Sequence, residues 1–237
     1  MEKLKRLLNS FESPRILDVG TGTGAFIGMI KQMYDGYEQI VGIDLLERAI
    51  TAAKENFKED NRIEFKVMDI NEMEYDENYF DIVILSNTLH HLSDVKKTIE
   101  QMEKYVKNGG IILINEMVSN DLNKAQLSHK YVHHLAAEVD RTFGDFHNDT
   151  FTNIEILQIL KDNSTFQIKD AWDFQGSSHN EPTDELIEFF QSTMDRLIAK
   201  SKDEDKEYFE KKSVKVMKHI KTHGFESATP LVVVLAR

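Results

Sequence analysis

Three glycines in five positions, Gly20, Gly22 and Gly24, follow the apolar run "RILDV", which carries Asp18. Glycine adopts backbone angles that other residues avoid, and it lets a ligand approach the main chain. Where a helix begins directly after such a loop, its free N–H groups point toward the ligand. The stretch therefore predicts a ligand cradle at a strand-to-helix turn.

Two further acidic residues close the next two strand-like runs. Asp44 ends "QIVGID" and Asp69 ends "IEFKVMD". Because open parallel sheets bind ligands outside the carboxyl ends of their strands, these carboxylates and the glycine loop are expected at one edge. Asp44 lies where an acid accepts hydrogen bonds from ribose hydroxyls, and Asp69 can reach an adenine amino group. The pattern indicates a nucleoside cofactor.

More than one cofactor fits the glycine loop at this point. Gly20, Gly22 and Ala25 can be read as the G-x-G-x-x-G/A dinucleotide fingerprint, which leaves a nicotinamide-dependent oxidoreductase open. The string D-x-G-x-G-x-G, the acid at Asp69 and a last strand with no helix behind it favour another nucleoside cofactor. A protein that binds this cofactor without catalysis is a third interpretation.

His90 and His91 follow the strand-like run "DIVILSN", at the same edge as the predicted cofactor site. A neutral imidazole there can take a proton from an acceptor that must lose one, so both are candidate general bases. We favour the alternative, in which they pack at a helix start and wall the cofactor. Glu116, after the next strand, either lines a pocket or hydrogen-bonds a neighbouring helix terminus.

The predicted helix "NKAQLSHKYVHHLAAEVDRT" carries further histidines, and His147 lies close downstream. His129 and His133 are four residues apart, as are His134 and Glu138, so each pair shares a helix face at a spacing compatible with metal ligands. Lining of an acceptor pocket, with His133 and His134 as weak catalytic candidates, and ordinary packing are the alternatives. Because no complete ligand set is evident, we expect no bound metal and a metal-independent reaction.

The elements that position these residues alternate along the first half of the chain. Apolar residues between 95 and 106 recur at helical spacing, with Ser93 as the expected cap. Nearly continuous apolar strands separated by helices predict a doubly wound, mostly parallel α/β sheet. Its first strands are expected at 15–20, 39–44, 63–69, 81–87 and 109–117.

The second half continues this pattern with two helical insertions, at about 119–150 and 182–222. Between them lie a helix with a capping box at Thr152 and Glu155 and a strand over 166–174. "PLVVVLAR" then closes the sheet as an antiparallel last strand. With no linker in evidence we expect a single domain, 1–237, whose insertions form a lid on the acceptor side or a homodimer interface.

With these motifs in order, the sequence resembles the class I S-adenosylmethionine-dependent methyltransferases, in particular the small-molecule group that includes quinone-biosynthesis enzymes. "LDVGTGTG", "VGIDLLERAI", "VMDINEM" and "FDIVILSNTLHHL" match the family's first four motifs, and "YVKNGGIILINE" resembles its fifth-strand region. The likeness covers roughly residues 14–116. It implies a seven-stranded Rossmann-like fold and in-line transfer of a methyl group to a small molecule, with S-adenosylhomocysteine as product.

The resemblance also implies roles for particular residues. The glycine loop would lie against the methionine and ribose parts of the cofactor, and Asp18 would bind its ammonium group. Asp44 would accept hydrogen bonds from both ribose hydroxyls. The positions assigned to the adenine and to the adjoining crevice are Leu45, Asp69, Ile70, Ser86 and Asn87.

Composition and charge limit which binding partners and which cellular compartment we expect. Acidic residues outnumber basic ones 41 to 29 and give a net charge of −12, so nucleic acid is an unfavourable partner. The sequence shows no signal-peptide pattern and no apolar run of membrane-spanning length, from which we expect a cytoplasmic protein without a membrane partner. With no cysteine, thiolate catalysis and cysteine-bound metals are excluded.

Overall fold

The computed structural model describes residues 1–174 and 181–237, and within these residues seven strands form one sheet in the order β3-β2-β1-β4-β5-β7-β6. Neighbouring strands from β3 to β5 pair in parallel, whereas β7 is antiparallel to both β5 and β6. This confirms the predicted mostly parallel sheet with an antiparallel last strand. The strands are β1 Arg15–Val19, β2 Gln39–Asp44, β3 Ile63–Val67, β4 Phe80–Ser86, β5 Val106–Met117, β6 Gln167–Asp173 and β7 Pro230–Ala236.

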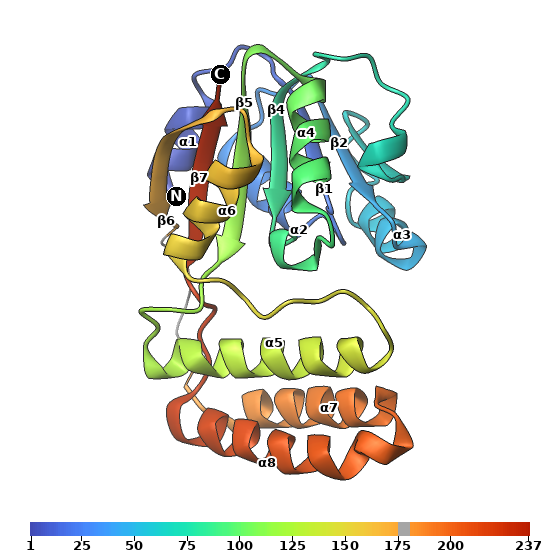
Figure 1. Cartoon of the computed structure of the whole chain (residues 1–237), viewed down its shortest axis with the longest axis vertical. Coiled ribbons are helices and arrows are strands. Elements are labelled where there is room, and N and C mark those ends of the chain that lie inside the picture. The colour runs from blue at the N-terminus through green and yellow to red at the C-terminus, as the bar shows by residue number, and fades with distance from the viewer. Residues whose placement is uncertain (175–180) are drawn as a thin grey trace.

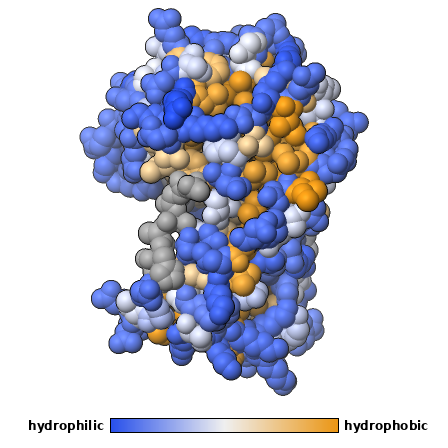
Figure 2. All heavy atoms as spheres, turned by 90° about the vertical axis from the view of Figure 1, so that its left-hand side faces the viewer, coloured by the Kyte–Doolittle hydropathy of each residue, from blue (hydrophilic) through white to orange (hydrophobic). Residues whose placement is uncertain are grey.

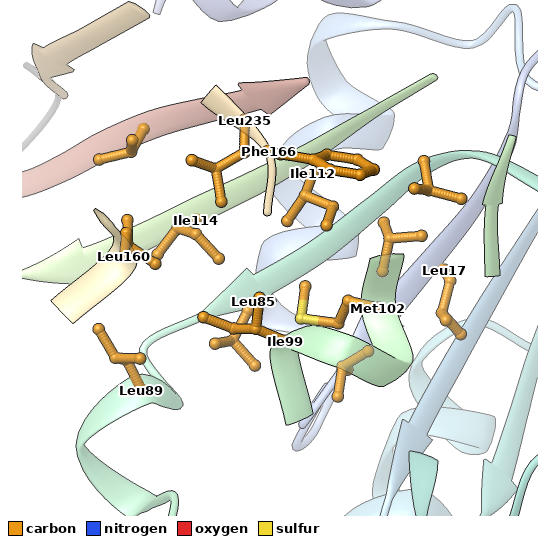
Figure 3. Close-up of a cluster of buried hydrophobic side chains, with 14 of the residues drawn as sticks. Leu17, Leu85, Leu89, Ile99, Met102, Ile112, Ile114, Leu160, Phe166 and Leu235 are labelled. Atoms are coloured by element: carbon orange, nitrogen blue, oxygen red, sulfur yellow. The ribbon is translucent and has the colours of Figure 1, made fainter. Parts of the chain in front are cut away.

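Helices cover both faces of the sheet, because successive strand residues point to opposite sides and both sides are apolar. Ile16 packs with the cluster under α1, α2 and α3, while its neighbour Leu17 packs with the cluster under α4 and α6. Figure 3 shows the second cluster, in which Met102 and Ile99 of α4 lie against the sheet. These helices are α1 Glu2–Leu8, α2 Ala25–Met33, α3 Glu47–Asn56, α4 Val95–Tyr105 and α6 Asn153–Asn163.

The two insertions form a separate layer of three helices, α5 Lys124–Thr142, α7 Asp184–Lys200 and α8 Lys206–His223. In Figure 1 this layer lies below the arrowheads of β4 and β5, so it covers the carboxyl ends of the parallel strands. It has an apolar core of its own, and Figure 2 shows mostly hydrophilic side chains on its outer surface. The core residues are Leu135, Val139, Phe190, Met194, Phe209, Val216, Met217 and Ile220.

Helix ends test the cap predictions directly. The capping box of α6 is confirmed: Thr152 Oγ1 accepts a hydrogen bond from the Glu155 N–H, and the Glu155 carboxylate accepts one from the Thr152 N–H. The cap predicted for α4 is wrong, because Asp94 and not Ser93 accepts a hydrogen bond from the Lys97 N–H. Val106, expected in that helix, is the first residue of β5.

Candidate active site

The glycine loop lies between β1 and α2, and its three glycines have φ angles of +69°, +54° and +82°. A Cβ on Gly20 would lie 2.5 Å from the Thr88 side chain, and one on Gly24 would lie 2.6 Å from Phe57. A Cβ on Gly22 would meet no atom of the described residues within 4 Å. Gly20 and Gly24 are therefore required by packing, whereas Gly22 presents bare backbone to open space, as a ligand cradle requires.

Asp18 is the next-to-last residue of β1, just before this loop, and is 1% exposed. Its Oδ2 accepts a hydrogen bond from the Thr21 hydroxyl at 2.7 Å, while Oδ1 has no hydrogen-bond partner among the described residues. Burial, with a smaller contribution from Asp44, raises the pKa of Asp18 to about 7. A buried carboxylate oxygen without a partner fits a cationic group such as the ammonium of S-adenosylmethionine.

Asp44 holds the glycine loop in shape. Its Oδ2 accepts a hydrogen bond from the Gly22 N–H at 2.8 Å and its Oδ1 accepts one from the Leu46 N–H at 2.9 Å. Each carboxylate oxygen accepts more than one hydrogen bond, so these contacts are compatible with the expected bonds from ribose hydroxyls. The adjacent Leu45 is 68% exposed, which places an apolar side chain where the resemblance expects an adenine wall.

The structure separates the other two residues assigned to adenine. Asp69 caps the short helix η1, Ile70–Glu72, by accepting hydrogen bonds from the backbone and side-chain N–H groups of Asn71. Ile70 is buried in the apolar cluster on the α4 side of the sheet. Asp69 therefore lies at the predicted edge, while the Ile70 side chain serves the core.

The end of β4 is fixed to both of its neighbours. Ser86 accepts a hydrogen bond from the Asn115 side chain at 2.9 Å, and Asn87, with φ at +47°, accepts one from the Met117 N–H at 3.0 Å. Thr88, which sequence reasoning missed, donates its hydroxyl toward the carbonyl oxygens of Gly20 and Ser86. Ser86 and Asn87 thus attach the end of β4 to β5, and Thr88 attaches it to the glycine loop.

Glu116 is fully buried and holds the short helix η2, Leu89–His91. Its Oε2 accepts a hydrogen bond from the Leu89 N–H at 2.9 Å, and its Oε1 lies 2.5 Å from Nδ1 of His90. Of the two interpretations of Glu116, the contact with a helix terminus is confirmed. The contact also fixes the ring of His90, a residue expected to pack at this position.

The structure gathers four histidines from separate segments. One ring nitrogen from each of His90, His91, His133 and His147 lies within 4.8 Å of the others. The first two belong to η2, the third to α5, and the fourth to the connection between α5 and α6. His147 is held through its Nδ1, which lies 2.8 Å from Oδ2 of Asp140. The cluster lies between the sheet's carboxyl edge and the helical layer.

Of the residues spaced four apart along α5, His129 with His133 and His134 with Glu138, all but His133 have other hydrogen-bond or ion-pair partners. His129 accepts a hydrogen bond from the Ala228 N–H, His134 from the Thr150 N–H, and Glu138 pairs with Lys212 at 2.5 Å. Tertiary partners therefore engage these side chains separately, although they share helix faces. Of the α5 histidines, His133 is the one that joins the cluster.

Desolvation dominates the electrostatics of the cluster. Partial desolvation of the ring, together with the charges of His90 and His147 when protonated, lowers the pKa of His91 to about 4, although the residue is also exposed to solvent. Burial likewise lowers the pKa values of His133 and His147 below the ordinary histidine value. These imidazoles are neutral at pH 7, and a lowered pKa makes each a weaker proton acceptor. That weakens the general-base interpretation of His91 and His133.

Comparison with known proteins identifies the family. A family model described as "Methyltransferase domain" matches residues 11–148, which is more than half of the chain. The chain belongs to the methyltransferase domain family. This confirms the resemblance to class I S-adenosylmethionine-dependent methyltransferases, a family whose cofactor is S-adenosylmethionine.

Among curated relatives, this chain is 28% identical over 51% of its length to phosphoethanolamine N-methyltransferase of Plasmodium falciparum. It is 27% identical over 48% of its length to demethylmenaquinone methyltransferase of Bacteroides fragilis. In each case the match spans 47% of the relative. A match to the hybrid PKS-NRPS synthetase thnA of Trichoderma harzianum covers 3% of that protein. The chain thus spans about half the length, or much less, of the curated relatives it matches.

Solved structures share the fold at low sequence identity. A putative methyltransferase from Bacillus halodurans superposes with a TM-score of 0.62 at 16% identity, over 99% of this chain and 95% of that one. The [4+2]-cyclase SpnF superposes with a TM-score of 0.57 at 17% identity, over 100% of this chain and 81% of that one. Because a cyclase has this fold too, the fold alone does not specify the reaction.

None of the helices in the described ranges is long and apolar enough to cross a membrane.

Proposed function

We propose that this methyltransferase domain transfers a methyl group from S-adenosylmethionine to a small-molecule acceptor. The observation that carries the proposal is Asp18, whose buried Oδ1 lacks a partner among the described residues and whose Oδ2 is bonded to Thr21, the residue before Gly22 in the glycine loop. A buried carboxylate next to an open glycine loop stabilises a ligand that combines a cation with a nucleoside. S-adenosylmethionine has both parts.

The chain's own residues would contribute binding and alignment. When bound, S-adenosylmethionine supplies a methyl group on a sulfonium, which is already a strong donor. Asp18 would hold the ammonium group, Asp44 the ribose and Leu45 one face of the adenine. Fixing the donor against an acceptor in line makes the reaction effectively unimolecular, and this accounts for much of the rate that an enzyme adds. No dedicated base is needed unless the acceptor must lose a proton.

The helical layer supports a small molecule as acceptor. It covers the carboxyl edge of the sheet (Figure 1) and buries its apolar faces in its own core, as a lid does. A covered site admits a small molecule and excludes a folded protein, and the net charge of −12 disfavours nucleic acid. In this proposal the layer selects the acceptor within a single domain, and a homodimer through the same helices is compatible with it.

Calorimetry with S-adenosylhomocysteine and with NADH tests the cofactor, and formation of S-adenosylhomocysteine with a panel of small acceptors tests the reaction. We expect binding of S-adenosylhomocysteine, none of NADH, and turnover with one acceptor class. Tight binding of NADH alone would indicate the oxidoreductase. Cofactor binding without turnover on any acceptor would favour the non-catalytic alternative.

Replacing residues 182–222 by a short linker tests the lid. We expect loss of turnover with part of the cofactor binding retained, because the glycine loop and Asp44 lie outside the replaced segment. His133→Ala and His134→Ala are expected to change acceptor turnover more than cofactor affinity. A folded linker variant that methylates the same acceptor at an unchanged rate would exclude the lid.

A further inference from the structure

We infer that His90, His91, His133 and His147 together bind one divalent first-row transition-metal ion between the sheet and α5. Their ring nitrogens lie within 4.8 Å of one another. A zinc ion with bonds to nitrogen of about 2.0–2.1 Å sets tetrahedral ligand atoms about 3.3 Å apart, so modest side-chain rotations bring four such nitrogens onto one ion. Neither the family match nor the proposed methyl transfer requires this site.

The nitrogens that would bind the ion lack other partners. Nε2 of His90, Nδ1 of His133 and Nε2 of His147 are buried without a hydrogen-bond partner in the described part of the chain. Buried polar atoms are nearly always paired, so three unpaired nitrogens in one place need an explanation. The rings are close, with centroids 4.8 Å apart for His90 and His133 and 5.1 Å apart for His133 and His147. A shared cation satisfies all three at once.

Two carboxylates orient two of the histidines, His90 and His147, as metal ligands. Glu116 lies 2.5 Å from Nδ1 of His90, and Asp140 lies 2.8 Å from Nδ1 of His147. Each contact places the ring proton on Nδ1 and leaves the lone pair on Nε2, the unpartnered atom. A carboxylate behind a ligating histidine is the common second layer of metal sites, where it fixes the ring and raises its basicity. Lys200 in turn hydrogen-bonds Asp140.

The segments that carry the histidines are joined by their backbones as well. The Asn148 N–H donates to the His90 carbonyl oxygen at 2.9 Å, which fixes the segment of His147 against η2. His90 and His147 are buried and His91 is exposed, so the cluster opens to solvent on the side of His91. The proposed site is therefore closed on the side of His90 and His147 and accessible on the side of His91.

The four neutral imidazole ligands determine which class of metal ion the site would bind. Nitrogen ligands suit Zn²⁺, Ni²⁺, Co²⁺, Cu²⁺ and Fe²⁺, whereas Mg²⁺ and Ca²⁺ prefer oxygen. The inference departs from the expectation that no metal is bound, which considered only histidine pairs along one helix. The complete set is assembled from three segments.

Titration of chelator-treated protein with Co²⁺ tests the site through its visible absorption. We expect one Co²⁺ per chain, displaced by one Zn²⁺, with at least 100-fold weaker binding in His133→Ala. Asp140→Asn, which leaves all four ligands in place, is expected to weaken binding by about 10- to 100-fold. His134→Ala is the matched control, because the neighbouring ring of His134 bonds Thr150, and it should bind as the wild type does.

The outcomes that overturn the inference are specific. They are absence of saturable binding at micromolar Co²⁺, one ion per two chains, or equal affinity in wild type and His133→Ala. If His133→Ala does not fold, Asp140→Asn decides, and unchanged affinity there rejects the oriented site. A loss in His134→Ala equal to that in His133→Ala would place the metal elsewhere. None of these measurements depends on methyl transfer.

Discussion

The substitution Asp18→Asn separates two effects of this residue: the loss of folding stability caused by its buried charge, and its contribution to cofactor binding. The carboxyl group is buried and its pKa is raised from 3.8 to about 7. One pKa unit corresponds to about 1.4 kcal/mol, so ionised Asp18 destabilises the cofactor-free fold by about 4 kcal/mol. Asparagine is isosteric, carries no charge and still accepts a hydrogen bond from Thr21. We therefore expect Asp18→Asn to be more stable than the wild type at neutral pH.

The sign follows from proton linkage. Between about pH 4 and pH 7 the folded state keeps a proton on Asp18 that the unfolded state has released, so the free energy of unfolding falls as pH rises through this window. Above about pH 7 both states are ionised and the penalty is constant. The gain from Asp18→Asn should thus be about 2 to 3 kcal/mol larger at about pH 8 than at about pH 5.

Urea denaturation of the wild type and of Asp18→Asn without cofactor, at the two pH values, measures this difference. Calorimetry measures the contribution to binding. Asp18→Asn should bind S-adenosylhomocysteine at least about tenfold more weakly, because a charged hydrogen bond to its ammonium group is lost. An equal stability gain at both pH values would refute the buried charge. Undiminished affinity would refute its role in binding.

Further substitutions test the glycine loop and the hydrogen bonds of Glu103. Asp44→Ala should weaken S-adenosylhomocysteine binding by about 1.5 to 3 kcal/mol in calorimetry, and an unchanged affinity would remove Asp44 from the site. Gly22→Ala and Gly109→Ala both place a Cβ at positive φ in open space and should each lower stability by about 1 to 2 kcal/mol, but Gly22→Ala alone should lose cofactor affinity. Equal effects on affinity would exclude the cradle. Glu103→Ala should cost about 2 to 3 kcal/mol in urea denaturation, since this buried carboxylate accepts hydrogen bonds that join α4 to the start of β6. A loss below about 0.5 kcal/mol would contradict that role.

Local patterns were sufficient to predict the sheet. Every predicted strand forms, and "QIVGID" coincides with β2 to the residue, because apolar runs bounded by turn residues have few other solutions. The turn that carries Asp18 and the glycine loop was predicted for the same reason, since its spacing is local, whereas its role in binding stays a prediction. The cap at Asp94 was missed by one residue, because serine and aspartate cap helices about equally well and the choice depends on local geometry.

The histidine cluster could not be predicted from spacing. His91 and His133 are far apart in the sequence, and they meet because α5 crosses the carboxyl edge of the sheet. The same crossing brings the backbone N–H of Ala228 to Nδ1 of His129, so His129 bonds Ala228 while His133, four residues on, joins the cluster. Contacts between insertions and the sheet depend on the packing of whole helices, and helical periodicity alone does not specify it.

The separate core of the helical layer has a consequence for how mutations combine. Leu135, Phe190 and Ile220 pack with one another and not with the two clusters on the sheet, so substitutions in the two regions should have additive effects on stability. Substitutions can then accumulate in the helical layer without using up the stability that the sheet and its helices have in reserve. The histidine cluster, to which both regions contribute, is where such changes would have to be made together.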